Sequence, residues 1–279
     1  MSQALTRVFR RTAAMACLCG AVTAAGCAPQ VSTQQEVQLG ADYSAQINRQ
    51  LPLLNDRATL NYVNQIGQQL AAIADPRGIQ YHFYVVNSDV VNAFALPGGY
   101  VYVNRGLIER ADNVSEFAGV LAHEIGHVAE RHSIEQLQRA QNANLGLNVL
   151  YGVLLGRNPS GLEQAGIQVG GSAVFAGYGR DAEREADAVG VRYMVRAGYN
   201  PNGMATFFEE LLSMQQRQPS RVAQWFSTHP TTQERVNNTR AIIAQTPGAN
   251  NANLTTDTRA FQTFRSRVAS LPAPADRGR

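Results

Sequence analysis

The pentapeptide His123-Glu124-Ile125-Gly126-His127 constrains this chain more than any other part of its sequence. The pattern Asn113-Val-Ser-Glu116 resembles a capping box, and apolar residues then recur at helical spacing, so the pentapeptide is predicted to lie within a helix. Two histidines four positions apart share one face of a helix, about 6 Å apart along its axis. Both imidazoles can reach one zinc ion at ~2.0–2.1 Å, and Glu124 is placed to act as a catalytic base beside it.

A zinc site of this kind needs a third protein ligand. His132 follows His123 by nine residues, about 180° round the helix, so we expect it at the surface. Glu183 and Asp187 share one face of a second predicted helix over residues 162–196. We expect Glu183 to bind zinc and Asp187 to accept a hydrogen bond from a ligand histidine. The alternative is that these acids form exposed ion pairs with neighbouring arginines.

The remaining patterns predict a mainly helical α+β fold. Residues 81–86 and 100–103 read as strands on either side of the turn Leu96-Pro97-Gly98-Gly99, which predicts a small antiparallel sheet beside the helix of the pentapeptide. Asp56 is expected to cap a helix, and further helices are expected over 202–216 and 231–245, with a loop over 221–230. The apolar stretch 145–156 is shorter than the ~20 residues of a bilayer span. We expect one domain over 51–245 and a polar linker with a short amphipathic helix over 246–279.

The N-terminus resembles a secretory signal. Residues 1–26 have a basic start and an apolar stretch, and small residues precede Cys27, as in bacterial lipoproteins. Cys27 is therefore the expected lipidation site, and residues 27–50 the anchor and linker; a soluble periplasmic form is the alternative. Cys17 and Cys19 would leave with the signal, so a metal site built from cysteines is not expected. Three of the 24 basic residues and none of the 21 acids lie in this segment, which leaves 21 against 21 and gives no reason to expect nucleic acid as a partner.

Four stretches resemble the HtpX-like zinc metallopeptidases, and in particular the periplasmic members of that family. They are residues 92–107, 123–132 and 180–187, together with Thr228-His229-Pro230 before Arg235. The resemblance implies a gluzincin-type fold with one zinc ion per chain. It implies that the zinc ligands are His123, His127 and Glu183, that Glu124 is the base, and that Asp187 supports a ligand.

The resemblance also places His229 and Arg235 near the metal. His229 would either stabilise an oxyanion or bind zinc as a plug over the resting site, and Arg235 would bind substrate or pair with an acid. From the sequence alone, a histidine before a proline also fits an exposed loop.

The expected activity is that of a zinc metalloendopeptidase, which cleaves unfolded or misassembled envelope proteins in the bacterial periplasm. The strand residues Asn92, Ala93, Phe94 and Ala95 are candidates to hold an unfolded polypeptide as an added strand. The chain would be held at the outer membrane by its lipid anchor, and no partner protein is predicted. Two alternatives stay open. One is a largely non-catalytic, zinc-containing chaperone or assembly factor, and the other is a zinc hydrolase that acts on cell-wall amides.

Overall fold

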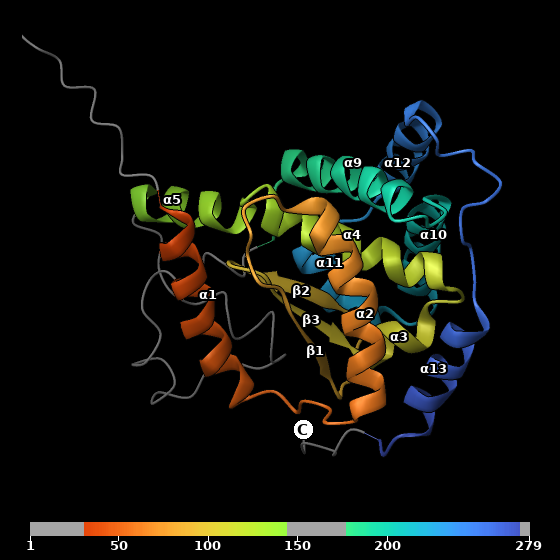
Figure 1. Ribbon diagram of the computed structural model, residues 1–279, viewed down its shortest axis with the longest axis horizontal. Helices are drawn as coiled ribbons and strands as arrows, with labels where there is room; N and C mark the ends of the chain where they lie inside the picture. Colours follow the sequence, from red (N-terminus) through yellow and green to blue (C-terminus); the bar gives the residue numbers. More distant parts are fainter. Residues whose placement is uncertain (1–30, 144–176, 274–279) are drawn as a thin grey trace, which may run out of the picture. The chain divides into compact units, whose positions relative to one another are not determined.

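The computed structural model describes residues 31–143 and 177–273 (Figure 1). These residues are mainly helical and include one small sheet, so the predicted α+β class is confirmed. In chain order the elements are α1 (Thr33–Asn48), α2 (Arg57–Ala74), β1 (His82–Val86), β2 (Ala93–Leu96), β3 (Tyr100–Asn104), α3 (Arg105–Arg110), α4 (Val114–Ala129), α5 (His132–Ala143), α9 (Arg180–Arg196), α10 (Asn202–Arg217), α11 (Pro219–Thr228), α12 (Gln233–Gln245) and α13 (Arg259–Ser270).

The sheet is mixed rather than antiparallel, which corrects the prediction. Its strand order is β1-β3-β2, with β3 parallel to β1 and antiparallel to β2. The turn at Gly98 and Gly99 has φ angles of 72° and 92°, a conformation that glycine adopts without steric cost, and it folds β2 back on β3 as a hairpin. Residues 87–92 connect β1 to β2 past the end of β3. The strands β1 and β2 therefore do not pair with each other, and β3 lies between them.

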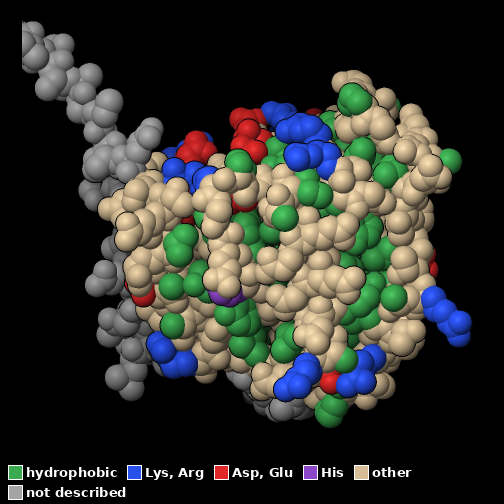
Figure 2. All heavy atoms as spheres, in the orientation of Figure 1, with side chains coloured by type: hydrophobic (Ala, Val, Ile, Leu, Met, Phe, Trp, Pro, Cys, Tyr) green, Lys and Arg blue, Asp and Glu red, His purple; other side chains and the backbone are tan. Residues whose placement is uncertain are grey.

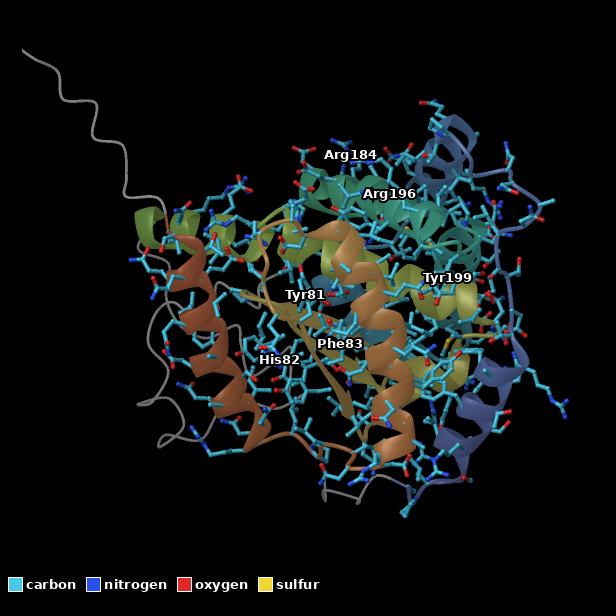
Figure 3. All side chains as sticks on the ribbon, in the orientation of Figure 1. Tyr81, His82, Phe83, Arg184, Arg196 and Tyr199 are labelled. Atoms are coloured by element: carbon cyan, nitrogen blue, oxygen red, sulfur yellow. The ribbon has the colours of Figure 1, made fainter. Side chains whose placement is uncertain are left out.

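Side chains alternate between two covered faces of the sheet. Phe83 packs on α2 and belongs to the main core, whereas Phe94 and Tyr102 stack on the other face, with ring centroids 4.7 Å apart, beside Ile47 of α1. Figure 3 shows the same alternation in β1, with Phe83 towards α2 and His82 towards α1. Burial of each large apolar side chain stabilises the fold by about 1.5–3 kcal/mol.

Helix α4 is the central element, and nearly all of it is buried. The side chain of Asn113 accepts a hydrogen bond from the backbone N–H of Glu116 at 3.0 Å, so the predicted cap is present. The helix contacts α2, β2, α9 and α10. An added Cβ at Gly126 would lie 2.8 Å from a methyl carbon of Val189, so only glycine lets α9 approach this closely. This close approach places the acidic residues of α9 beside the histidines of α4.

Several predicted helices are confirmed and two predictions are wrong. The Asp56-capped helix and those over 202–216 and 231–245 correspond to α2, α10 and α12. The described part of the helix predicted over 162–196 begins only at Arg180, because residues 177–179 are not helical. The loop predicted over 221–230 is largely α11, which starts with Pro219 in its first turn and buries Val222 and Trp225 at helical spacing.

The tail helix docks on the domain itself. Phe261, Phe264 and Val268 of α13 are buried, and the ring of Phe264 stacks on Tyr62 of α2 with a centroid distance of 4.4 Å. Arg105 donates hydrogen bonds to backbone oxygens at the end of α13, at distances of 2.7 and 3.1 Å.

The signal segment 1–26, Cys27 and the apolar stretch 145–156 lie outside the described residues. Among the residues that are described, no helix combines the length and the apolar character needed to cross a bilayer.

Candidate metal centre

The two histidines of the pentapeptide point into the core from one face of α4. Their side chains are fully buried, and the Nε2 atoms of His123 and His127 lie 3.0 Å apart. Burial, followed by the charge of His123, lowers the pKa of His127 well below its usual value. A neutral imidazole with a free lone pair is the form that binds a metal ion.

Helix α9 brings two carboxylates to the same place, as the sequence predicted. An oxygen of Glu183 lies 3.3 Å from Nε2 of His127, and its other oxygen lies 3.6 Å from Nε2 of His123. Asp187 lies one turn further on, with an oxygen 2.9 Å from Nδ1 of His123. Both acids are buried, so the alternative of exposed ion pairs does not describe them. It does describe Arg184, which pairs with Asp181 on the outer side of the same helix (Figure 3).

His229 is buried in the same cluster rather than exposed in a loop. It directly follows α11, where its backbone N–H bonds to Trp225 and its ring lies 4.9 Å from the Trp225 ring. Its Nδ1 atom is 3.3 Å from Nε2 of His123 and 3.1 Å from Glu183. Burial opposes protonation of His229, but the carboxylates of Glu124 and Glu183 outweigh it and raise its pKa. Four of the chain's five histidines are buried, and Figure 2 shows histidine on this face only as a small patch.

The four side chains His123, His127, Glu183 and His229 fit a zinc ion. Each offers one ligand atom, and these atoms lie within 4.8 Å of one another. With Nε2 of His123, Nε2 of His127, Nδ1 of His229 and Oε1 of Glu183 as these atoms, four of their separations run from 3.0 to 3.3 Å. Four ligand atoms in a tetrahedron at ~2.0–2.1 Å from zinc stand about 3.3–3.4 Å apart. Nitrogen and carboxylate oxygen are also ligand types that zinc accepts.

Glu124 lies beside these ligands without a hydrogen-bond partner among the described residues. Its side chain is fully buried, and Nε2 of His229 is 3.4 Å from one of its oxygens. Burial raises the pKa of Glu124 above its usual range, although the charges of His229 and His123 oppose the rise. A buried carboxylate that makes no hydrogen bond is costly to a fold, and this makes Glu124 a candidate for a chemical role.

Arg235 of α12 pairs with the acids of α9. Its guanidinium donates two hydrogen bonds to Asp187, at 2.7 and 2.8 Å, and also contacts Glu183. The same group lies 4.4 Å from the centre of the Phe208 ring. Burial opposes ionisation of Asp187, but Arg235 outweighs it and keeps the pKa of Asp187 below its usual value. Of the two roles considered for Arg235, the structure therefore displays pairing with an acid.

His132 was predicted at the surface, and this prediction is wrong. Helix α4 ends at Ala129, and Arg131 has a positive φ of 61°, so the chain turns and His132 does not continue the helix. Its side chain is 3% exposed, and its Nδ1 lies 2.9 Å from Nδ1 of His127. Sequence reasoning missed Tyr178 altogether, whose ring stacks on His127 at a centroid distance of 3.8 Å.

The candidate substrate strand lies at an edge of the sheet. Ala93, Phe94 and Ala95 belong to β2, and in the described sheet β2 pairs only with β3. Asn92 precedes the strand and is fully buried, and neither polar atom of its side chain has a hydrogen-bond partner in the described part of the chain. Buried side-chain amides usually have hydrogen-bond partners, so Asn92 is an exception among the described residues.

Comparison with known proteins adds a family to this geometry. Residues 57–243 match the model of Peptidase family M48. The chain is 34% identical over 216 residues to the beta-barrel assembly-enhancing protease of Escherichia coli K12, a match that covers 75% of this chain and 44% of that protein. It is 28% identical to the mitochondrial metalloendopeptidase OMA1 of Schizosaccharomyces pombe, over 64% of this chain and 51% of that protein. It is 31% identical to metalloprotease YcaL of Escherichia coli K12, over 65% and 71%. The chain thus spans less than half the length of the first of these relatives.

Proposed function

The chain belongs to peptidase family M48, and from this premise we propose that it is a zinc-dependent endopeptidase that cleaves unfolded or misassembled proteins of the bacterial envelope. The observation that carries the proposal is Glu124, a buried carboxylate that has no hydrogen-bond partner among the described residues and lies next to the side chains that could hold a metal ion. A zinc ion that only stabilises a fold does not need such a group.

His123, His127 and Glu183 would hold one zinc ion. When bound, this ion supplies a Lewis acid that polarises a peptide carbonyl and makes water more acidic. Asp187 accepts a hydrogen bond from Nδ1 of His123, which leaves Nε2 of that ring free for the metal. Arg235 holds Asp187 in turn, through two hydrogen bonds.

Glu124 moves the proton. The pKa of Glu124 is raised and so lies closer to neutral pH, and a general base works best when its pKa is near the working pH. It takes a proton from the attacking water and returns it to the nitrogen of the leaving amine. Its burial, the cause of its raised pKa, also keeps bulk water from competing for that proton.

His229, which directly follows α11, would close the resting site. Its Nδ1 stands where a fourth ligand would bind, as the 3.3 Å and 3.1 Å distances to His123 and Glu183 indicate. Release of His229 would open that position to substrate, and the freed ring could then donate a hydrogen bond to an oxyanion. His229→Ala separates the two roles: a plug predicts weaker zinc binding with cleavage retained, and an oxyanion donor predicts loss of cleavage.

Unfolded chains are the proposed substrates because β2 is an edge strand of the described sheet, and an edge strand can bind an extended chain through its backbone. An extended peptide added to that edge would pair through main-chain groups. Folded proteins do not offer a free strand of this kind. The beta-barrel assembly-enhancing proteases among the relatives support envelope proteins as the source of substrate.

We place the protein in the periplasm, anchored to the outer membrane through a lipid on Cys27. The support is the pattern of the first 27 residues and the beta-barrel assembly that the relatives' names state. Cys27→Ser should move the protein from the membrane fraction to the soluble fraction of the periplasm. Unchanged fractionation would refute the anchor and favour the soluble periplasmic form.

Replacement of Glu124 by glutamine tests the activity. Glu124→Gln keeps the size of the side chain and should bind zinc as the parent chain does, with the same melting temperature, while cleavage of casein falls by at least about 10²-fold. Glu130→Gln is the matched control, since Glu130 is exposed at the end of the same helix and should cleave normally. Unchanged cleavage by Glu124→Gln would refute the enzyme assignment. A parent chain that binds zinc but cleaves neither casein nor cell-wall amides would instead favour the assembly factor.

A further inference from the structure

His132 lies behind the metal-binding histidines rather than among them. Its Nδ1 points at Nδ1 of His127, which is the ring nitrogen that faces away from the cluster. We propose that His132 is a positioning residue that fixes the ring of His127 for metal binding. This inference rests on the proposed zinc site and adds a supporting residue to it.

The hydrogen bond between the two rings decides the tautomer of each. A metal ion at Nε2 of His127 requires a lone pair there, so the proton of that ring stands on Nδ1. It is donated over 2.9 Å to Nδ1 of His132, which must then carry its own proton on Nε2. That proton faces Glu185, one carboxylate oxygen of which lies 3.3 Å from Nε2 of His132. The chain from His127 through His132 to Glu185 therefore has one consistent set of donors and acceptors.

The backbone before His132 is shaped for this contact. Arg131 adopts the left-handed conformation, with φ of 61°, which costs a residue other than glycine roughly 1–2 kcal/mol. Its side chain is held by the buried carboxylate of Glu36, whose oxygen lies 2.7 Å from Nε of Arg131. Arg77 binds the same oxygen at 3.0 Å. The turn that brings His132 back to His127 is thus stabilised by Glu36 of α1 and, through Glu36, by Arg77 in the loop after α2.

The residue after His132 supports the His127 ring from a second direction. The hydroxyl groups of Ser133 and Tyr178 are 2.7 Å apart and hydrogen-bonded. The ring of Tyr178 lies on the face of the His127 ring, with an interplanar angle of 12°. His132 holds the edge of the imidazole and Tyr178 holds its face, so together they leave it one orientation.

The two metal-binding histidines of α4 are therefore supported in different ways. His123 bonds to the buried carboxylate of Asp187, whereas His127 bonds to the imidazole of His132. Partners of this kind, which touch a ligand but not the metal, typically change metal affinity by 10–100-fold. We expect an effect of that size when the acceptor at His132 is removed.

Three substitutions separate the hydrogen bond from packing. His132→Asn places an amide oxygen at the position of Nδ1, His132→Gln places it one bond further away, and His132→Leu has no acceptor. Zinc dissociation constants are measured by competition with a chromophoric chelator, and folding is checked by circular dichroism and by melting in EDTA. His132→Leu and His132→Gln should bind zinc about 10–100-fold more weakly, and His132→Asn within about threefold of the parent chain. His82→Leu is the control, since His82 lies in β1 away from the cluster.

The results divide clearly. Recovery of affinity in His132→Asn alone, at equal metal-free stability, would support the proposal. Parental affinity in His132→Leu, or an equal loss in all three variants, would overturn it. If His132→Leu does not fold, equal affinities of the Asn and Gln variants would still overturn it. A parent chain that binds no zinc would instead refute the metal centre proposed above.

Discussion

Loss of the Arg235 side chain should destabilise the metal-free protein strongly. Arg235→Met keeps most of the apolar stem over Phe208 but removes the guanidinium from Asp187 and Glu183. Two buried carboxylates then lose their nearest cation. Breaking a buried pair in this way costs about 3–5 kcal/mol, because a charge is left without compensation. For a domain of this size that is a fall in melting temperature of roughly 6–20 °C.

Differential scanning fluorimetry in EDTA measures this fall, and the same helix offers a matched control. Arg240 pairs with Glu209 at 2.7 Å, but both side chains are nearly half exposed, so Arg240→Met should change stability by less than about 1 kcal/mol. Zinc should recover part of the loss in Arg235→Met, because the metal ion would neutralise Glu183. Equal melting temperatures for Arg235→Met and Arg240→Met in EDTA would refute this account of the buried charges.

Three further changes test other parts of the structure. Glu183→Ala should weaken zinc binding more than His132→Leu does, and unchanged affinity by chelator competition would remove it from the ligand set. Burial opposes ionisation of Asp75, but Arg77 outweighs burial and lowers the pKa of Asp75. The pair therefore stabilises the fold above about pH 4, and this stability is lost as the pH falls further. The free energies of unfolding measured with urea at pH 3 and at pH 7 should differ less in Asp75→Asn than in the parent chain. Gly126→Ala places a carbon 2.8 Å from a side chain of α9 and should cost about 1–3 kcal/mol, whereas Gly179→Ala, with open space around it, should cost less; equal melting temperatures would contradict the close contact.

The sequence predicted those parts of the site that follow from helical periodicity. His123 and His127 share a face of α4, and Glu183 and Asp187 share a face of α9, because residues four apart always do so on a helix. The structure brings these four side chains together, and their roles as ligands and supports remain predictions. His229 entered through the family resemblance alone, since no periodic pattern marks a residue just beyond a helix.

The features of the site and the sheet that could not be predicted depend on where helices end and on how helices and strands pack against one another. The argument that placed His132 on the opposite face assumed an unbroken helix, and a single left-handed residue, Arg131, made it wrong. Tyr178 lies 51 residues after His127 in the chain, so no local pattern could indicate their stacking. The parallel pairing of β1 with β3 was missed for a related reason, because strand order is set by packing on α2 and α1 rather than by the strand sequences.

The ion pair between Glu36 and Arg131 also has a mechanical consequence. Glu36 lies in the first turn of α1, close to the start of the described chain, and Arg131 lies just beyond the helix that carries His127. If the protein is tethered by its N-terminus, tension on the tether would reach Arg131 through this buried carboxylate and through the hydrogen bond that Arg131 donates to the backbone oxygen of Val31. The turn between α4 and α5 would then carry this tension. A pull from the membrane would thus strain the same turn that aligns His132 with His127.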